Sequence, residues 1–337
     1  MVNKKKIDIS VVVPVYSGEL YLESLAEKIN TTKSIWDQNS STPFRLIELI
    51  FVEDSAIDGS RNVLKLIAEK YDWVRVIELS RNFGQHPATI AGILHSSGEW
   101  VVTMDEDLQH CPSKIELLLK TVCEYSSDLV YAKPKVDSNV HDSFLRDFGS
   151  KSIKKIVRRI TGLKHVTKFN SFRLIRGDIA RAAASICHRE TFFDVALCWY
   201  TDKVATCEIQ LNDVRFQETG ESGYNFFLLA KHASRLIKTS DSKITRFGLV
   251  IGLVAFMFSI LYIFYIILAK SFGWFGTDVQ GWASIMVAIT FFGSVSLLMV
   301  GACIEHLMVV KKHLHGEPTF FVVDRSSDDM LKQYFIE

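Results

Sequence analysis

Residues 100–109 have the sequence Trp-Val-Val-Thr-Met-Asp-Glu-Asp-Leu-Gln, in which an apolar run passes directly into a polar one. The apolar half predicts a buried strand. Asp105, Asp107 and Gln109 stand at alternate positions, so their side chains can leave the strand end on one side. Carboxylate and amide oxygens suit a hard divalent cation, and such a cation can hold a diphosphate. Alone, the pattern is also typical of carboxylates in a solvated turn, so the neighbouring sequence has to discriminate.

Strands and helices alternate on the N-terminal side of this segment. Apolar runs at 9–15, 47–52 and 74–79 predict strands, and residues 21–30, 60–71 and 87–95 predict helices. The alternation is typical of an α/β domain with a largely parallel sheet, in which ligands bind beyond the carboxyl ends of the strands. Polar residues follow each expected strand: Tyr16 and Glu19, Asp54 and Asp58, Arg81 and Asn82, and Asp105 and Asp107.

Motif absences and composition narrow the class of protein. The chain has neither a Gly-x-Gly-x-x-Gly nor a Walker pattern, which disfavours a dinucleotide enzyme or a P-loop ATPase and favours a nucleotide-sugar domain. With 337 residues, 48% of them hydrophobic and 23% charged, the chain is globular and long enough for two domains. A net charge of +1 gives no support for nucleic-acid binding. The six cysteines lack CxxC spacing, which predicts reduced thiols without a zinc site.

Two long uncharged runs, 247–268 and 279–304, predict transmembrane helices, because each has the roughly 20 residues that cross hydrocarbon. The alternative is a pair of buried helices in a soluble core. Basic residues flank both outer ends (Lys231, Arg235, Lys238, Lys243, Arg246, Lys311 and Lys312), whereas the connection has Lys270 and Asp278. The positive-inside rule therefore places both outer ends in the cytoplasm. The expected divisions are a cytoplasmic domain at 1–223, interfacial amphipathic helices at 224–246, a transmembrane hairpin at 247–304 and a cytoplasmic tail at 305–337.

Several motifs resemble one family. They are VVVPVY at 11–16, VEDS at 52–55 with DGS at 58–60, LSRNFG at 79–84, and DEDLQ at 105–109 followed by Pro112. In these motifs the chain is similar to the inverting family 2 glycosyltransferases with the GT-A fold. Within that family it resembles the polyprenyl-phosphate glycosyltransferases, which include the dolichyl-phosphate mannose synthases and bacterial undecaprenyl-phosphate glucosyltransferases. The resemblance implies a Rossmann-like, mostly parallel sheet followed by the two transmembrane helices.

The resemblance also assigns roles to residues. It implies that Asp105 faces the nucleotide-sugar and that Asp107 and Gln109 bind Mg²⁺ or Mn²⁺. The residues expected to contact the donor are Pro14, Tyr16, Glu19, Asp54, Asp105, Glu106, Asp107, Lys133 and Arg215, and those expected to be catalytic are Asp105, Asp107, Arg173 and Lys133. Three positions depart from the family pattern: Ser17-Gly18-Glu19 replaces Asn-Glu, Ser171 replaces a frequent Asp, and Glu221 replaces a frequent Lys.

The implied reaction moves a hexose from a nucleotide-sugar, expected to be a UDP-sugar, to polyprenyl phosphate, expected to be undecaprenyl phosphate, at the cytoplasmic face of a bacterial inner membrane. A phosphomonoester has a second pKa of about 6, so this nucleophile is largely ionised at pH 7 and needs little help from a general base. The leaving diphosphate needs the cation at Asp107 and Gln109. Two other functions remain open: a membrane polysaccharide synthase, although the Gln-x-x-Arg-Trp motif is missing, and a non-catalytic GT-A scaffold.

A basic amphipathic segment at 144–163 is expected to lie on the membrane lipid and to attract the acceptor phosphate. Its cations alternate with apolar residues and are Lys151, Lys154, Lys155, Arg158 and Arg159. An ordinary solvated helix face is the competing interpretation. Assembly into a homo-oligomer is left open.

Overall fold

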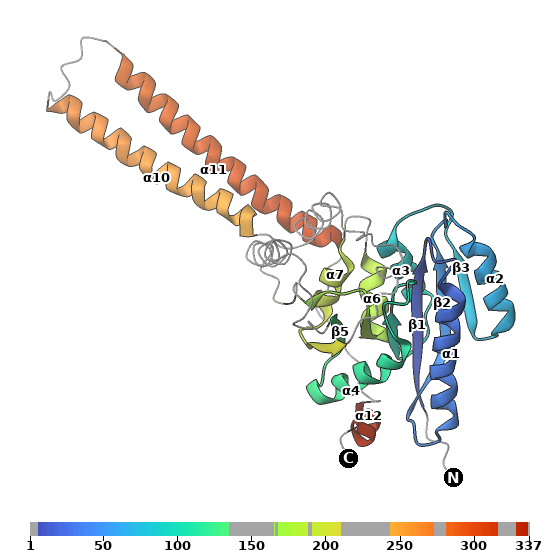
Figure 1. Cartoon of the computed structure of the whole chain (residues 1–337). Coiled ribbons are helices and arrows are strands. Elements are labelled where there is room, and N and C mark those ends of the chain that lie inside the picture. Colours follow the sequence, from blue (N-terminus) through green and yellow to red (C-terminus); the bar gives the residue numbers. More distant parts are fainter. Residues whose placement is uncertain are drawn as a thin grey trace, which may run out of the picture.

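The computed structural model describes residues 6–134, 165, 168–187, 191–209, 243–272, 281–315 and 328–335. Its centre is a seven-stranded sheet with the order β3-β2-β1-β4-β6-β5-β7 (Figure 1). β6 runs antiparallel to β4 and β5, and the other pairs are parallel, which confirms the mostly parallel sheet. The strands are β1 (Ile7–Val15), β2 (Phe44–Glu53), β3 (Val74–Glu78), β4 (Trp100–Thr103), β5 (Leu129–Pro134), β6 (Arg173–Arg176) and β7 (Val204–Ile209).

Helices cover both faces of the sheet, which explains why its central strands are continuously apolar. On β1, Val11 and Val13 pack in one core cluster and Val12 packs in the other. The first cluster includes residues of α1 (Leu22–Gln38), α2 (Ser60–Lys70) and α4 (Ile115–Tyr125), which follows the 3₁₀ turn η1 (Pro112–Lys114). The second includes residues of α3 (Gln85–Leu94), α6 (Gly177–Ile186) and α7 (Phe193–Tyr200).

The strand order determines where polar residues can meet. After β1, the chain builds β2 and β3 on one side and then returns to place β4 on the other side of β1. The carboxyl ends of β1 and β4 therefore flank the point where the order reverses, which is where open α/β sheets bind ligands. Tyr16 follows β1 and Asp105 lies just beyond β4 at this point. The sheet thus brings the expected site residues to one edge.

Two long helices form an antiparallel hairpin that projects from the α/β domain (Figure 1). They are α10 (Lys243–Ser271) and α11 (Trp282–His315), and within them Gly252–Ala269 and Ser284–Met308 have mean hydropathies of 2.4 and 2.2. Only 22% and 11% of these stretches are buried, whereas a helix in a soluble core would be mostly buried. By length, composition and exposure, both helices of the hairpin are therefore able to cross a membrane.

Small residues line the contact between the two helices. A Cβ atom added to Gly252 would lie 3.1 Å from the carbonyl oxygen of Leu297, so the backbones approach closely there. Ser259 and Ser294 are also buried in the hairpin. Transmembrane helices commonly associate through close approach at small residues. Apolar side chains gain little when they exchange contact with lipid tails for contact with another helix.

The helix α12 (Asp328–Phe335) returns to the α/β domain after the hairpin. Leu331 is fully buried in the first core cluster, and the ring of Phe44 lies 5.6 Å from that of Tyr334. Asp328 accepts a hydrogen bond of 2.7 Å from the buried Arg176. The chain leaves the α/β domain before α10 and contacts it again at α12. The start of α10 and the end of α11 are therefore both held on the side of the hairpin where the α/β domain lies.

Candidate active site

Two distant segments of the chain bond to the carboxylate of Asp105, and its own loop bonds to its backbone. Nε2 of Gln85, on α3, donates to one oxygen at 2.6 Å, and Oγ of Ser171 donates to the other at 2.5 Å. The backbone N–H of Asp105 donates to Nδ1 of His110 at 3.3 Å. The side chain keeps a quarter of its surface exposed. Asp105 is thus fixed in orientation and still accessible, as a residue that contacts a ligand must be.

His110 is a support of this aspartate that sequence patterns did not reveal. It is 3% exposed, and its ring stacks on Phe172 with the centroids 4.9 Å apart. Burial lowers the pKa of His110, against the effect of nearby Asp105 and Asp107, so the ring is neutral at pH 7. Since Nδ1 accepts the hydrogen bond, the proton is assigned to Nε2.

The next turn presents the two expected metal ligands. Leu108 has a φ of +60°, a conformation that leucine rarely adopts, and its side chain is buried in the core. Anchoring Leu108 inward leaves Asp107 and Gln109 partly exposed on either side, with Oδ1 of Asp107 accepting from the backbone N–H of Gln109 at 3.2 Å. The described residues contain no cluster of three His, Cys, Asp or Glu side chains for a metal. Asp107 and Gln109 still fit Mg²⁺ or Mn²⁺, because Mg²⁺ commonly takes one or two carboxylates and completes its shell with substrate phosphates and water.

Two other acidic residues brace loops at this edge. The oxygens of Glu106 accept from the backbone N–H groups of Tyr16 at 3.0 Å and Ser17 at 3.1 Å. Burial raises the pKa of Glu106, and the charges of Asp58 and Asp107 add to the rise. Glu19 accepts from the N–H of Gly59 at 2.8 Å, and a Cβ at Gly59 would collide with it. The Glu106 bonds hold the turn after β1, and the Glu19 bond ties it to the loop after β2.

Asp54 anchors the turn after β3. It is 2% exposed, and its two oxygens accept from the N–H groups of Phe83 and Gly84, each at 2.7 Å. Gly84 has a φ of +98°, which favours glycine. If Asp54 also accepts from the base of a donor, as expected, its two oxygens must serve the base and these backbone N–H groups together.

Arg173 lies at the start of β6 in a buried ion pair. Its guanidinium pairs with Asp194 and donates from Nε to Oγ1 of Thr103 at 3.1 Å. The hydroxyl of Tyr131 donates to the same aspartate at 2.7 Å, and burial raises the pKa of Tyr131 well above its usual value. Asp194 therefore neutralises Arg173, which favours a positioning role for the arginine over direct capture of a diphosphate.

A cavity of about 200 Å³ opens between these groups. Asp105, Gln85, Ser171 and Arg173 line it, which places two of the expected catalytic residues in one hollow. The remaining lining residues are Pro14, His86, Thr89, Thr103, Met104, Phe169, Asn170, Phe192 and Asp194. The cavity lies at the carboxyl ends of β1 and β4.

Other expected site residues lie elsewhere. Tyr16 is 38% exposed and, like Lys133 at the end of β5, is absent from the lining of this cavity. Lys133 is exposed and lies close enough to Lys168 to contribute, after burial, to the lowered pKa of that lysine. Arg215, Glu221 and the five cations of the basic segment at 144–163 lie outside the described residues, so their expected roles remain predictions.

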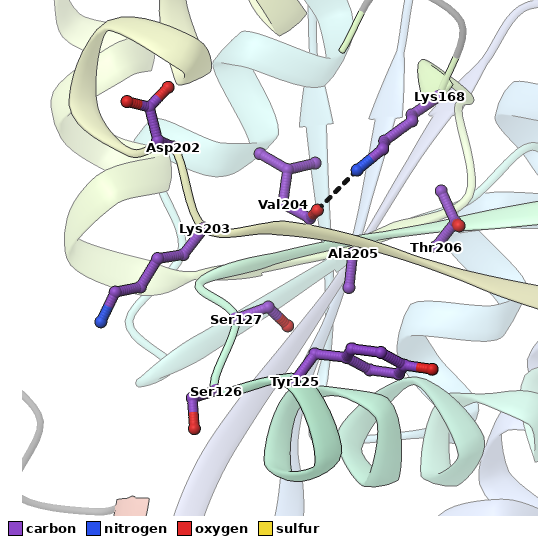
Figure 2. A pocket seen from close by; sticks show the side chains of 9 residues that line it. All are labelled: Tyr125, Ser126, Ser127, Lys168, Asp202, Lys203, Val204, Ala205 and Thr206. Carbon is purple, nitrogen blue, oxygen red and sulfur yellow. Dashed lines mark hydrogen bonds between the residues drawn. The ribbon is translucent and has the colours of Figure 1, made fainter. Parts of the chain in front are cut away.

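A larger hollow, of about 460 Å³, lies at the opposite edge of the sheet (Figure 2). It is formed by residues 125–127 at the end of α4 and by residues 202–206, which lead into the edge strand β7, together with Lys168. Nζ of Lys168 is bonded to the carbonyl of Val204 at 2.8 Å, and Figure 2 shows Lys203 pointing away from it. The charged groups do not converge there, so we place the candidate site at Asp105.

The chain is similar to several known proteins. The family described as glycosyl transferase family 2 matches residues 10–182, which is more than half of the chain. An undecaprenyl-phosphate 4-deoxy-4-formamido-L-arabinose transferase of Shewanella sediminis is 27% identical, over 96% of this chain and 94% of that protein. A prophage bactoprenol glucosyl transferase homolog of Escherichia coli is 26% identical, over 89% and 93%. Among solved structures, a mannosyl-3-phosphoglycerate synthase from Rubrobacter xylanophilus matches with a TM-score of 0.46 and 12% identity, over 69% of this chain and 72% of that one.

Proposed function

Because this chain belongs to glycosyl transferase family 2, we propose that it transfers a sugar from a nucleotide-sugar to polyprenyl phosphate at a membrane. The observation that carries the proposal is the combination, on one chain, of the Asp105 cavity with a hairpin long and apolar enough to enter lipid. A lipid-linked acceptor resides in the membrane, so an enzyme that uses it needs a segment that enters lipid. The similar proteins named for undecaprenyl phosphate and bactoprenol align with 96% and 89% of the chain, which supports the same acceptor class here.

The donor is proposed to lie along the carboxyl ends of β1 and β4, with its diphosphate beside Asp107 and Gln109. A bound Mg²⁺ or Mn²⁺ ion at these residues would supply the positive charge that the leaving diphosphate requires. Burial is the main cause of the raised pKa of Glu106, and the carboxylates of Asp58 and Asp107 add to it, so negative charge gathers at this edge. Such a surplus favours binding of a cation together with the donor.

The proposed chemistry is a single displacement. An oxygen of the acceptor phosphate forms a bond to the anomeric carbon, the bond from that carbon to the donor diphosphate breaks, and the bonding electrons leave with the diphosphate. Attack from the opposite face inverts the anomeric configuration. Because the acceptor phosphate is already ionised at pH 7, the neutral Ser171 in place of a carboxylate is compatible with turnover.

The proposed topology places the α/β domain and α12 in the cytoplasm. The ion pair between Arg176 and Asp328 holds the two on one side of the hairpin. The basic residues that flank the outer ends of α10 and α11 make that side the cytoplasmic one. In this arrangement the domain comprises residues 1–223, interfacial helices occupy 224–246, and the cations of the 144–163 segment face anionic lipid and the acceptor phosphate.

The direct test is transfer of radiolabel from UDP-glucose, UDP-GlcNAc, UDP-galactose and GDP-mannose into organic-extractable undecaprenyl phosphate. The purified full chain is assayed with Mn²⁺ and with EDTA. We expect label in lipid from at least one donor with Mn²⁺ and none with EDTA. Folded protein that neither binds nor transfers from any of the four donors would contradict the proposal.

A further inference from the structure

The cavity at Asp105 has two chemically different walls. One is polar and carries Gln85, Asp105 and Ser171, which are joined by the hydrogen bonds to the Asp105 carboxylate. The other is aromatic: the rings of His86 and Phe192 have centroids 4.8 Å apart, and Phe169 stacks on Phe192 at 6.1 Å. A ligand that fills this space needs one polar edge and one apolar face.

We infer that this cavity is the subsite for the sugar ring of the donor, and that it selects an uncharged sugar whose C–H face lies on His86 and Phe192. The inference rests on the proposed function and deepens it. A pyranose ring presents hydroxyl groups around its edge and C–H groups on its faces, which matches the two walls. The hydroxyls then bond to Gln85, Asp105 and Ser171.

The size of the cavity assigns it to the sugar alone. Its volume of about 200 Å³ lies below the roughly 300–1,000 Å³ of pockets that enclose larger ligands, so one ring fits and a whole nucleotide-sugar does not. Asp107 and Gln109, which are expected to hold the diphosphate, are absent from the lining and lie just outside. The nucleoside therefore extends away from the cavity, towards the exposed Tyr16.

The charges of the lining determine the class of sugar. Asp194 neutralises Arg173, while the described partners of the Asp105 side chain are the neutral Gln85 and Ser171. Setting aside the imidazole of His86, the lining residues that the structure describes carry a surplus of one negative charge. A carboxylate on the sugar, as in a uronic acid, would face Asp105 in a partly desolvated space and be repelled. Neutral hexoses and their N-acylated or deoxy forms meet no such penalty.

The test measures binding of UDP, UDP-glucose, UDP-GlcNAc, UDP-galactose and UDP-glucuronate to the full chain in detergent, by calorimetry with Mn²⁺. If the transfer assay identifies GDP-mannose as the donor, GDP, GDP-mannose and GDP-mannuronate replace them. His86→Ala and Phe192→Leu are compared with the unaltered chain and with Tyr125→Leu, an exposed aromatic at the opposite edge. Melting temperatures establish that each variant is folded, and KM for the donor is measured alongside.

We expect both site variants to weaken the preferred nucleotide-sugar by roughly three- to tenfold and to leave the free nucleoside diphosphate unchanged. Tyr125→Leu should change neither, and the uronate donor should bind no better than the nucleoside diphosphate. Equal weakening of the nucleoside diphosphate would put the nucleoside in the cavity and overturn the inference. Unchanged donor binding in both variants, or tight binding of the uronate donor, would also overturn it. An unaltered chain that binds and transfers none of these compounds would instead overturn the proposed function itself.

Discussion

The hydroxyl of Ser171 donates to Oδ2 of Asp105 at 2.5 Å, so a serine supports the aspartate at a position where the family resemblance leads one to expect a second carboxylate. The same serine accepts through its carbonyl from Oγ1 of Thr103 at 2.6 Å, and Thr103 in turn accepts from Arg173. Asp105 is therefore linked through Ser171 to the buried Arg173–Asp194 ion pair. Its orientation depends on β6 as well as on its own loop.

Ser171→Ala should lower kcat/KM for the donor by about 10- to 100-fold, because a hydrogen bond to a charged group contributes roughly 1.5–3 kcal/mol. Ser171→Asp should be worse, since it places a second carboxylate against Asp105. Steady-state kinetics on both variants, with circular dichroism to verify folding, provides the measurement. Ser185→Ala, whose exposed hydroxyl bonds only within α6 among the described residues, is the control. Unchanged kinetics in Ser171→Ala would show that Gln85 alone suffices.

Asp107→Asn should reduce turnover by about 100-fold or more, because it removes the carboxylate proposed to bind the metal beside the leaving diphosphate. Gln109→Ala should act more weakly and raise the Mn²⁺ concentration that gives half-maximal activity. Initial rates measured over a Mn²⁺ titration separate the two effects. Asp202→Asn, at the opposite edge of the sheet, serves as the matched control and should leave the titration unchanged. An Asp107→Asn variant with a normal titration would remove this residue from the metal site.

Glu48→Gln should destabilise the fold at pH 7 by about 1–3 kcal/mol, since Glu48 is buried and accepts from Ser10, Ser97 and Arg75. Burial alone would raise the pKa of Glu48, but these hydrogen bonds outweigh it and lower the pKa below the usual 4.5. A carboxylate with a lowered pKa stabilises the folded state above its unfolded pKa, and that contribution is lost as the pH falls through the folded pKa.

Thermal melts of Glu48→Gln and the unaltered chain at several pH values between 7 and 3 test the linkage. The gap between their melting temperatures should be widest near pH 7 and should narrow below pH 4.5. Glu69→Gln, on the exposed side of α2, controls for general charge effects. A gap that widens on acidification would show that folding raises the pKa of Glu48 instead of lowering it.

Leu331→Ala should release α12 from the α/β domain, because deleting a fully buried leucine side chain costs about 2–5 kcal/mol, which is large for a contact made by one short helix. Limited proteolysis should then cleave the C-terminal segment much faster, with a smaller effect on the melting of the domain. Lys332→Ala alters the exposed neighbour and should behave like the unaltered chain. Equal protease resistance of Leu331→Ala would mean that the ring contacts and the Asp328 ion pair hold the helix unaided.

Lys332→Cys and Phe272→Cys should lie on opposite sides of the membrane. Labelling of intact cells with an impermeant maleimide should modify Phe272→Cys, at the end of α10, and should leave Lys332→Cys, on the docked α12, unmodified until the cells are opened. The parent chain with its native cysteines gives the background. Labelling of both sites in intact cells would contradict the cytoplasmic position of α12.

The strands that sequence patterns predicted are those that consist mainly of apolar residues, which indicate burial. β1, β2, β3 and β4 are of this kind, and the structure confirms them. β6 was not predicted, because it begins with Arg173 and ends with Arg176, and charged residues do not indicate a buried strand. These arginines are buried because Asp194 pairs with Arg173, while Asp128 and Asp328 pair with Arg176. Partners so distant in sequence become visible only in the folded chain.

The sequence by itself determined the class of the domain, the edge of the sheet where the candidate site lies, the position of Asp105 there and the apolar hairpin. These follow from local physics: the period of apolar residues, the direction of parallel strands and the length needed to cross lipid. Only the tertiary structure decided what each polar group at that edge does. Asp54 and Glu106, which the family resemblance leads one to expect at the donor, accept backbone N–H groups from distant turns, because a carboxylate bonds to the donors that folding brings to it.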